Sequence, residues 1–186
     1  MLPINFSPFP ELLTDKLLLR KVDKSDFNEI FFLRSDTRVM KYIERTPAKT
    51  SDDAFKFIEM ISKQEKNNLS ITWAITLKGN SKLIGTICFW NIIAEHYRAE
   101  IGYVLHPDYW GKGIMQEAIT EVINYGFKKM NLHSIEADVN PDNSSSIKLL
   151  EKNNFIKEAH FNENYYYEGR FYDSAVYSLL ANKWGK

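Results

Sequence analysis

The chain contains one cysteine in 186 residues, Cys88, so an internal disulfide framework and a cysteine-rich metal site are both excluded. Cys88 stands in the apolar run TICFW, where a buried structural thiol is the usual outcome. No apolar run is long enough for a membrane-spanning helix. The first ten residues hold three prolines and no basic start, which does not fit a signal peptide. We therefore expect a reducing, cytoplasmic setting and no membrane partner.

An excess of one charge is also missing, because 24 Lys and Arg residues balance 24 Asp and Glu residues. A nucleic-acid platform normally carries a basic excess, so no nucleic-acid partner is expected. The four histidines show no metal-ligand spacing. We therefore expect no catalytic metal.

The chain has a hydrophobic content of 44%, which is enough for one well-buried domain, and its 186 residues are too few for two such domains. We expect a loose N-terminal arm over residues 1–15 and a single domain over residues 16–186.

The apolar periodicity predicts a mixed α/β chain in which an antiparallel meander comes first. The expected strands cover 16–21, 71–77, 83–90, 95–105, 134–139, 155–160 and 171–180, with an aromatic loop between the last two. The expected helices lie after a cap at Asp23 or Ser25, around 39–43, from 51 or 52 onward, over 114–126 and over 144–152. Asn154 is predicted to take the left-handed conformation that ends the last helix.

Residues 100–126 read as strand, glycine loop and amphipathic helix. Gly111 and Gly113 lie in the loop, where a ligand can approach the backbone closely. Amides at a helix start, the helix dipole and the charge of Lys112 together suit a phosphate or diphosphate. The glycines alone equally fit an ordinary turn. The residues of this loop match neither the dinucleotide-binding fingerprint nor the Walker phosphate-binding motif.

This loop, Tyr109-Trp110-Gly111-Lys112-Gly113, resembles the acyl-CoA loop of the GNAT N-acetyltransferase superfamily. It is most similar to the ribosomal-protein N-terminal acetyltransferase (RimJ/RimL-type) branch, although Asp108 stands where the superfamily usually has Arg or Gln. Residues 140–155 resemble the second signature of the superfamily, with Asn154 in place of its Gly.

The resemblance implies the GNAT fold: a mixed central β-sheet with an antiparallel N-terminal meander, splayed parallel central strands and flanking helices. It also implies that acetyl-CoA lies in the opening between the splayed strands. Asn143 is alternatively a helix cap, and both roles are compatible. The implied cofactor-binding residues are Val104, Leu105, Trp110, Gly111, Lys112, Gly113, Ile114, Met115, Asn140 and Asn143.

The same resemblance assigns two catalytic residues. Glu100 matches the general base of the histone-modifying members, and its alternative is a surface ion pair with Arg98 or a nearby lysine. Many members protonate the thiolate with a Tyr, but Leu150 holds that position here. Ser146 is the substitute that the branch suggests. Its alternative is a first-turn helix residue bonded to the backbone, and water is a third candidate.

The expected activity is transfer of acetyl from acetyl-CoA to a primary amine, foremost the N-terminal α-amino group of a ribosomal protein. A small amine such as a polyamine, amino sugar or drug is the alternative acceptor. A CoA-binding module without turnover is the alternative from a different class. Monomer and homodimer both stay open, as do the roles of Tyr165, Tyr166, Tyr167 and Asp173.

Overall fold

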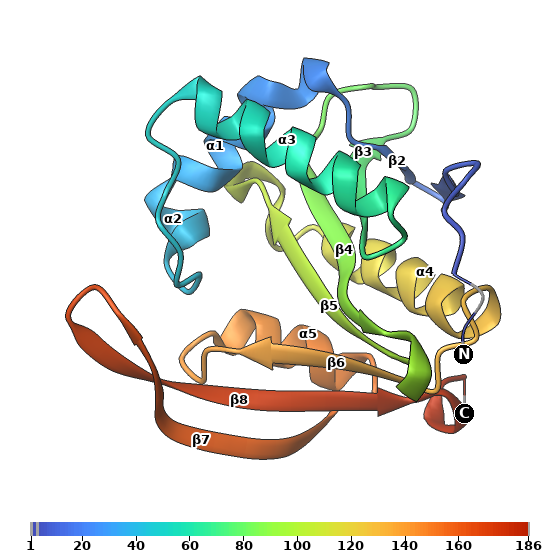
Figure 1. Ribbon diagram of the computed structural model, residues 1–186, viewed down its shortest axis with the longest axis vertical. Coiled ribbons are helices and arrows are strands. Elements are labelled where there is room, and N and C mark those ends of the chain that lie inside the picture. The colour runs from blue at the N-terminus through green and yellow to red at the C-terminus, as the bar shows by residue number, and fades with distance from the viewer. Residues whose placement is uncertain (1, 3, 186) are drawn as a thin grey trace.

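The computed structural model describes residues 2 and 4–185, and it contains one sheet of eight strands in the order β1-β2-β3-β4-β5-β6-β8-β7 (Figure 1). The strands are β1 Leu12–Leu13, β2 Leu17–Lys21, β3 Ile71–Leu77, β4 Gly85–Ile93, β5 Arg98–Leu105, β6 Ser134–Val139, β7 Ile156–Tyr167 and β8 Arg170–Leu180. The helices are α1 Phe27–Ser35, α2 Thr37–Met40, α3 Ser51–Lys66, α4 Ile114–Lys128 and α5 Ser144–Lys152.

Strands β1 to β5 form the predicted antiparallel meander. Helix α4 then connects β5 to β6, which lie parallel, and β6 pairs with β8 in the antiparallel sense. A parallel pair needs a long crossover, and an amphipathic helix supplies it. The mixed sheet expected of the GNAT fold is confirmed.

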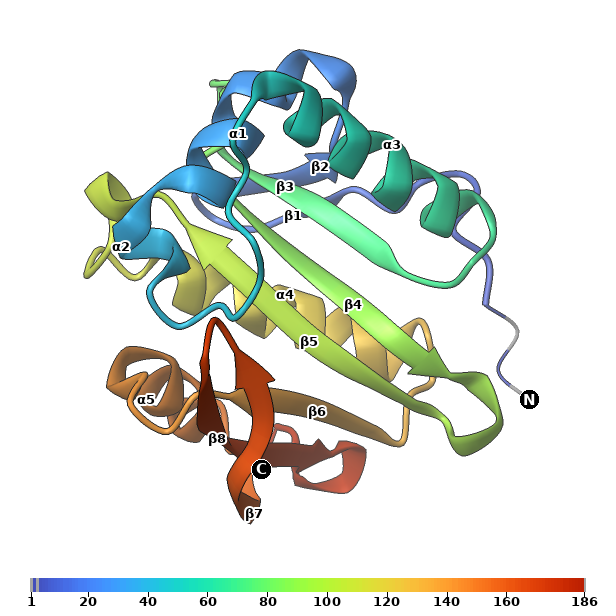
Figure 2. The ribbon, with the colours of Figure 1, turned by 60° about the vertical axis from the view of Figure 1, so that its left-hand side comes forward.

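The helices cover both faces of the sheet (Figure 2). On one face, alternate residues of β3 such as Trp73 pack with the buried face of α4, including Ile119 and Ile123. On the other face, Ile30 of α1 and Ile58 of α3 form a second buried cluster. Residues two apart on a strand share a face of the sheet. The odd-numbered and even-numbered residues of a strand such as β3 therefore pack in different clusters.

Strands β5 and β6 splay apart, as predicted. Their pairing runs only from Arg98 opposite Ser134 to Glu100 opposite Glu136. Beyond Glu100 the two strands diverge, which both ribbon views show (Figures 1 and 2). The C-terminal half of β5 therefore faces an opening rather than a neighbouring strand on that side.

The prediction of an aromatic loop between the last two strands is wrong. Strand β7 continues to Tyr167 and β8 begins at Arg170, so the turn between them consists only of Glu168 and Gly169. Both turn residues have positive φ, +44° and +90°, which matches the twist of a two-residue hairpin. Strand β7 is exposed except at Ala159, Tyr165 and Tyr167, which are half-buried, so its sequence lacks the apolar alternation that indicates a strand.

The prediction of a loose arm is also wrong. Leu2 and Phe6 are buried, and β1 pairs with β2. Trp73 Nε1 donates a hydrogen bond to the carbonyl of Pro10 at 2.7 Å, and Phe9 packs edge-on against the same indole. The arm thus closes one edge of the hydrophobic core.

Several boundaries shift by a few residues. Strand β4 starts at Gly85 and runs to Ile93, and β5 starts at Arg98, because a 3-10 turn over Ala94–His96 occupies the expected beginning. Helix α2 lies two residues earlier than expected. Helix α5 ends as predicted, with Asn154 at φ +64°. In the part of the chain that the structure describes, no helix has the length and apolarity that a membrane crossing requires.

Candidate active site

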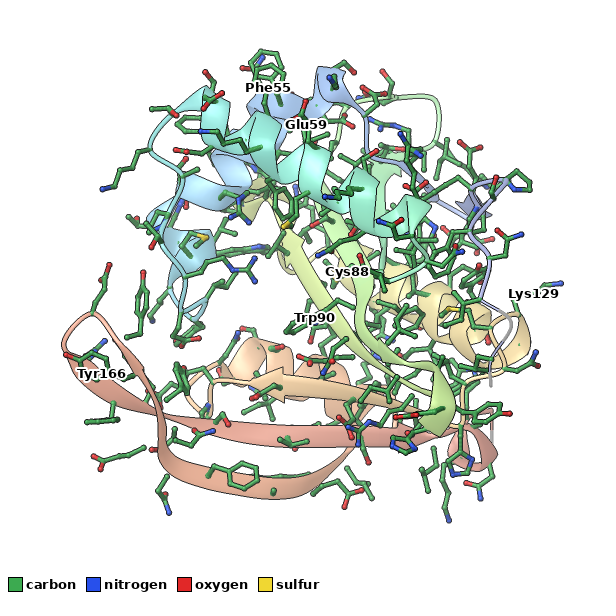
Figure 3. All side chains as sticks on the ribbon, in the orientation of Figure 1. Phe55, Glu59, Cys88, Trp90, Lys129 and Tyr166 are labelled. Atoms are coloured by element: carbon green, nitrogen blue, oxygen red, sulfur yellow. The ribbon has the colours of Figure 1, made fainter. Side chains whose placement is uncertain are left out.

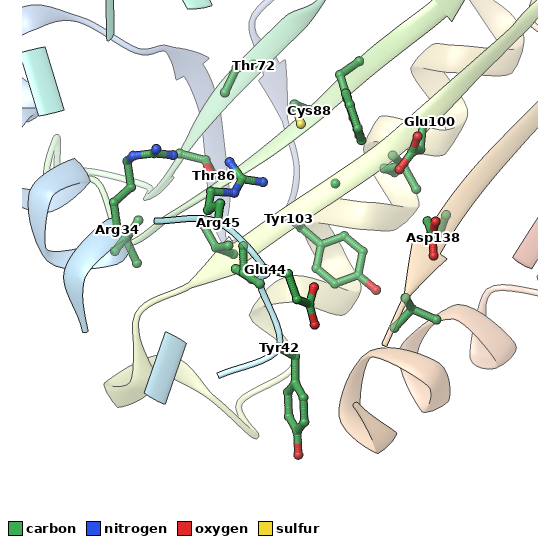
Figure 4. A pocket seen from close by; sticks show the side chains of 18 of the residues that line it. Arg34, Tyr42, Glu44, Arg45, Thr72, Thr86, Cys88, Glu100, Tyr103 and Asp138 are labelled. Atoms are coloured by element: carbon green, nitrogen blue, oxygen red, sulfur yellow. The ribbon is translucent and has the colours of Figure 1, made fainter. Parts of the chain in front are cut away.

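The opening between β5 and β6 leads into a cavity of about 810 Å³ that extends beneath α1 and α3 (Figure 4). Its walls come from β4, β5, β6, the N-terminal part of α5 and the segment that links α2 to α3. The polar and ionisable residues on these walls are Arg34, Tyr42, Glu44, Arg45, Gln64, Ser70, Thr72, Thr86, Cys88, Glu100, Tyr103, Asp138, Asn140, Asn143, Ser146, Tyr165 and Ser174.

Glu100 lies at the last paired position before β5 leaves β6. Burial raises the pKa of its carboxyl group to about 7, and the negative charge of Asp138 acts in the same direction. The predicted alternative, an ion pair with Arg98, does not form, because Arg98 pairs with Glu136 at 2.8 Å. Within residues 2 and 4–185 no cation lies at ion-pair distance from Glu100. A half-buried carboxyl of this pKa can exchange a proton near neutral pH.

Ser146, in the first turn of α5, lies with its hydroxyl oxygen 2.6 Å from that of Tyr103 on β5. Burial raises the pKa of Tyr103 to about 12, so its hydroxyl stays protonated. Tyr103 was not predicted as a site residue, because the family resemblance places the tyrosine on the helix, at the position of Leu150. Leu150 is fully buried in the core. The alternation of β5 places Tyr103 on the same face as Ile101 and Leu105, which pack in the core, so the sequence pattern contained no signal for a role in the site.

Asn143 caps α5, as the alternative reading proposed: its side-chain oxygen accepts from the amide of Ser146 at 3.1 Å. Asn140 donates to the Glu44 carboxylate at 2.9 Å. That bond ties the start of α5 to the segment between α2 and α3. Both asparagines line the cavity, so the structure brings them to the same place as Glu100.

The glycine loop has the geometry of an anion cradle. Gly111 and Gly113 have φ of +71° and +77°, which side chains rarely adopt, and no protein atom lies within 4 Å of a Cβ built at either position. Gly113 is the N-cap of α4, whose first hydrogen bond runs from the Glu117 amide to the Gly113 carbonyl at 3.1 Å. The preceding amides of a helix have no partner within it. These residues fit a diphosphate.

Two other loop residues have identified partners. Trp110 Nε1 donates to the carbonyl of Leu105 at 2.8 Å, which links the loop to the end of β5. Lys112 Nζ lies 5.6 Å from the centroid of the Tyr109 ring. Ile114 and Met115 form the first turn of α4, and Val104 lines the cavity. Eight of the predicted cofactor-binding residues therefore lie between the end of β5 and the start of α4, and the other two, Asn140 and Asn143, lie before α5.

Cys88 and Trp90 of β4 line the cavity between α3 and β6, and Trp90 is exposed in it (Figure 3). Burial raises the pKa of the Cys88 thiol to about 11, so it stays protonated at neutral pH. A thiol in this state is a poor nucleophile. Within the described ranges no three His, Cys, Asp or Glu residues form a group that could hold a metal ion.

The fold and the site together define an acyl-transfer enzyme, and comparison with known proteins gives the family. The acetyltransferase (GNAT) domain family matches residues 16–156. The chain therefore belongs to the GNAT acetyltransferases. It is 38% identical to the uncharacterized N-acetyltransferase p20 of Bacillus licheniformis, over 93% of this chain and 97% of that protein.

Two solved structures are also similar. The ribosomal-protein-S5-alanine acetyltransferase of Vibrio fischeri is 26% identical with a TM-score of 0.82, covering 95% of this chain and 100% of that one. The spermidine N-acetyltransferase of Vibrio cholerae, in complex with CoA and spermine, is 26% identical with a TM-score of 0.80, covering 91% and 98%. The present chain is an N-acetyltransferase that uses acetyl-CoA.

Proposed function

We propose that this enzyme acetylates a primary amine held in the cavity and that Glu100 removes the proton from the incoming ammonium group. The observation that carries the proposal is the state of Glu100: half-buried, without an ion-pair partner, and with a pKa of about 7. A general base works best when its pKa is near the working pH. An ordinary surface glutamate lacks that property.

Acetyl-CoA supplies the acetyl group as an activated thioester. The chain holds its diphosphate with residues 110–115, and the ends of β5 and α5 line the path of its pantetheine arm through Val104, Leu105, Asn140 and Asn143. A backbone amide near Val104 or Leu105 stabilises the oxyanion. These assignments are supported by the positive φ angles of the loop and by the opening beside β5.

Protonation of the departing thiolate falls to Ser146 together with Tyr103. The 2.6 Å bond between the two hydroxyls supports this assignment. When Tyr103 donates to Ser146, the Ser146 proton is free to point into the cavity. The high pKa of Tyr103 keeps this donor available across the physiological pH range.

The acceptor that the geometry supports best is a small amine. A cavity of about 810 Å³ falls within the roughly 300–1,000 Å³ typical of small-molecule sites. The similar enzyme from Vibrio cholerae carries spermidine in its name. The second candidate is the N-terminal α-amino group of a ribosomal protein, which the similarity to the S5-alanine enzyme favours. The proposed setting is the cytoplasm.

The experiment is CoA release from acetyl-CoA in the presence of single acceptors: spermidine, free amino acids, amino sugars and peptides that begin with alanine. We expect turnover with small amines to exceed turnover with peptides. Higher turnover with peptides would reverse the order of the two acceptors. If the protein binds acetyl-CoA in calorimetry but releases CoA with no amine in the panel, the proposed function is wrong.

A further inference from the structure

The ionisable residues of the cavity are divided by charge. Glu100 and Asp138 lie on the side formed by β5 and β6. On the opposite side, Arg34 of α1 and Arg45 of the segment after α2 extend their guanidinium groups toward Thr86 (Figure 4). Glu44 lines the cavity as well, where its carboxylate accepts from Asn140 at 2.9 Å, so the two guanidinium groups form a basic end apart from three carboxyl groups.

Arg34 and Arg45 lack the carboxylate partner that Arg20, Arg38 and Arg98 have. Among the described residues, no Asp or Glu oxygen lies within ion-pair distance of either side chain. Three of the arginines outside the cavity have such partners, Arg20 with Asp26 at 2.6 Å, Arg38 with Asp36 at 2.6 Å, and Arg98 with Glu136 at 2.8 Å, whereas Arg170 contacts the Tyr172 ring. Among the described residues the two guanidinium groups thus have no ion-pair partner, and the charge of Asp53 acts on Arg34 only from a longer distance.

Arg34 is also held in place rather than left to solvent. Its guanidinium carbon lies 4.1 Å from the centroid of the Phe57 ring, a stacking contact that orients the group. Its Nε is buried and has no hydrogen-bond partner. A buried donor without a partner costs free energy, which a ligand oxygen can recover. Burial, followed by the charge of Arg45, lowers the pKa of Arg34, so the two cations also repel each other.

We propose that the acceptor carries an anionic group, a carboxylate or a phosphate, which Arg34 and Arg45 bind while the amine of the same molecule faces Glu100. This inference rests on the proposed function and narrows its substrate class to zwitterionic amines. Guanidinium groups match the geometry of both anions. The site is separate from the diphosphate cradle, because Gly111, Lys112 and Gly113 are not among the residues that line the cavity.

The test uses pairs of acceptors that differ only in the anion: lysine with cadaverine, ornithine with putrescine, and glucosamine 6-phosphate with glucosamine. We expect kcat/KM to be roughly tenfold or more higher for the anionic member, as for a hydrogen bond to a charged group. The first two pairs report on a carboxylate and the third on a phosphate. Arg45→Gln should remove most of the preference and leave the affinity for acetyl-CoA unchanged.

Arg38→Gln is the matched control, since Arg38 is paired with Asp36 and does not line the cavity. Arg45 is exposed, so its replacement leaves the core intact. Arg34→Gln and Arg34→Lys form a second pair, in which the lysine should keep part of the preference. Calorimetry of lysine and of glucosamine 6-phosphate with CoA-bound protein measures the anion site without turnover.

The possible outcomes separate the two hypotheses. Equal kcat/KM within every pair, with no effect of Arg45→Gln on binding or turnover, overturns the anion site and leaves the acetyltransferase proposal standing. Absence of turnover with every amine overturns the proposed function. In that case, binding of an anionic amine that Arg45→Gln abolishes and Arg38→Gln preserves still supports the anion site.

Discussion

The hydroxyl oxygens of Tyr103 and Ser146 lie 2.6 Å apart and join β5 to α5 across the opening that the splayed strands create. Tyr103 reaches the opening from the strand, whereas the expected tyrosine of the second motif would have come from the helix. Leu150 occupies that helical position and is buried. A hydroxyl pair built from two elements thus stands in the region where the departing thiolate needs a proton.

Replacing either hydroxyl should therefore lower turnover more than binding. We expect Ser146→Ala to lower kcat by roughly 10² or more, the contribution of a general acid, and Tyr103→Phe to lower it by less. The KM for acetyl-CoA should change little in both variants. Tyr166→Phe is the control, because Tyr166 is exposed on the hairpin and does not line the cavity. Parental kcat in Ser146→Ala would leave water as the acid.

Glu100 should give the enzyme a rising pH profile. Because its pKa is raised to about 7, the carboxylate form needed for proton removal is scarce below that pH and abundant above it. We expect Glu100→Gln to lower kcat by roughly 10² to 10⁴ near neutral pH and to move the rise to the higher pH at which the amine loses its proton unaided. At high pH the amine is already neutral, so mutant and parent rates should converge. Near-parental turnover of the mutant at every pH would exclude Glu100 as the base.

The same raised pKa predicts that the stability of the protein falls with rising pH, whereas its turnover rises. The folded protein binds the Glu100 proton more tightly than the unfolded chain, so stability from this group is present at low pH and is lost as pH rises through about 7. Glu100→Gln should therefore raise Tm more at pH 8 than at pH 5. Glu59→Gln, on the exposed face of α3 and 3.4 Å from Lys24, should shift Tm equally at both values. An equal shift in Glu100→Gln would contradict the raised pKa.

Asp138 should affect the pH at which kcat/KM rises. Its charge contributes to the raised pKa of Glu100 after burial does. Asp138→Asn removes that charge and keeps the side-chain shape, so the rising limb of kcat/KM should move to lower pH. Asp142→Asn, on the exposed turn before α5, is the control and should leave the limb in place. A limb that does not move in Asp138→Asn would mean that burial and the charge of Glu136, without Asp138, raise the pKa of Glu100.

Replacing Gly113 should weaken cofactor binding by more than the backbone strain of the new side chain explains. Gly113 and Gly79 both have φ of +77° and open space around a built Cβ, so a valine strains either backbone to a similar degree. Only Gly113 lies at the start of α4, where a side chain would meet the diphosphate. We expect Gly113→Val to weaken acetyl-CoA binding in calorimetry and Gly79→Val to leave it unchanged. Equal affinities in two folded variants would show that the loop does not hold the cofactor.

The two asparagines that end α5 should respond in opposite ways. Asn154 has φ +64°, so Asn154→Gly should be neutral or mildly stabilising. Asn153 is buried, donates to the Leu149 carbonyl at 2.7 Å and bonds Gln116 at 2.9 Å. Asn153→Ala leaves partners unsatisfied and should cost about 1–3 kcal/mol in denaturant unfolding. A large loss of stability in Asn154→Gly would contradict the assigned conformation.

The sequence could predict the elements whose pattern is local. Ile71–Leu77, Ser134–Val139 and Ser144–Lys152 have the bounds expected from apolar period and caps. The arm and the hairpin could not be predicted in this way. The arm is ordered by contacts with Trp73, more than sixty residues away in sequence. Strands β7 and β8 form a long hairpin because β8 is held in the sheet by its pairing with β6. The fixed β8 then sets the register in which β7 pairs with it.

The sequence by itself determined the order of strands and helices, the glycine loop that precedes α4, and Glu100 as the carboxylate of the central strand. These are properties of neighbours along the chain: side-chain period, turn residues and helix caps. The tertiary structure alone decided where β5 leaves β6, which pairs Tyr103 with Ser146 and buries Glu100 beside Asp138. It also placed Arg34 and Arg45 in one cavity. Charges and hydroxyls from distant segments acquire their pKa values and partners only when packing removes water and brings them together.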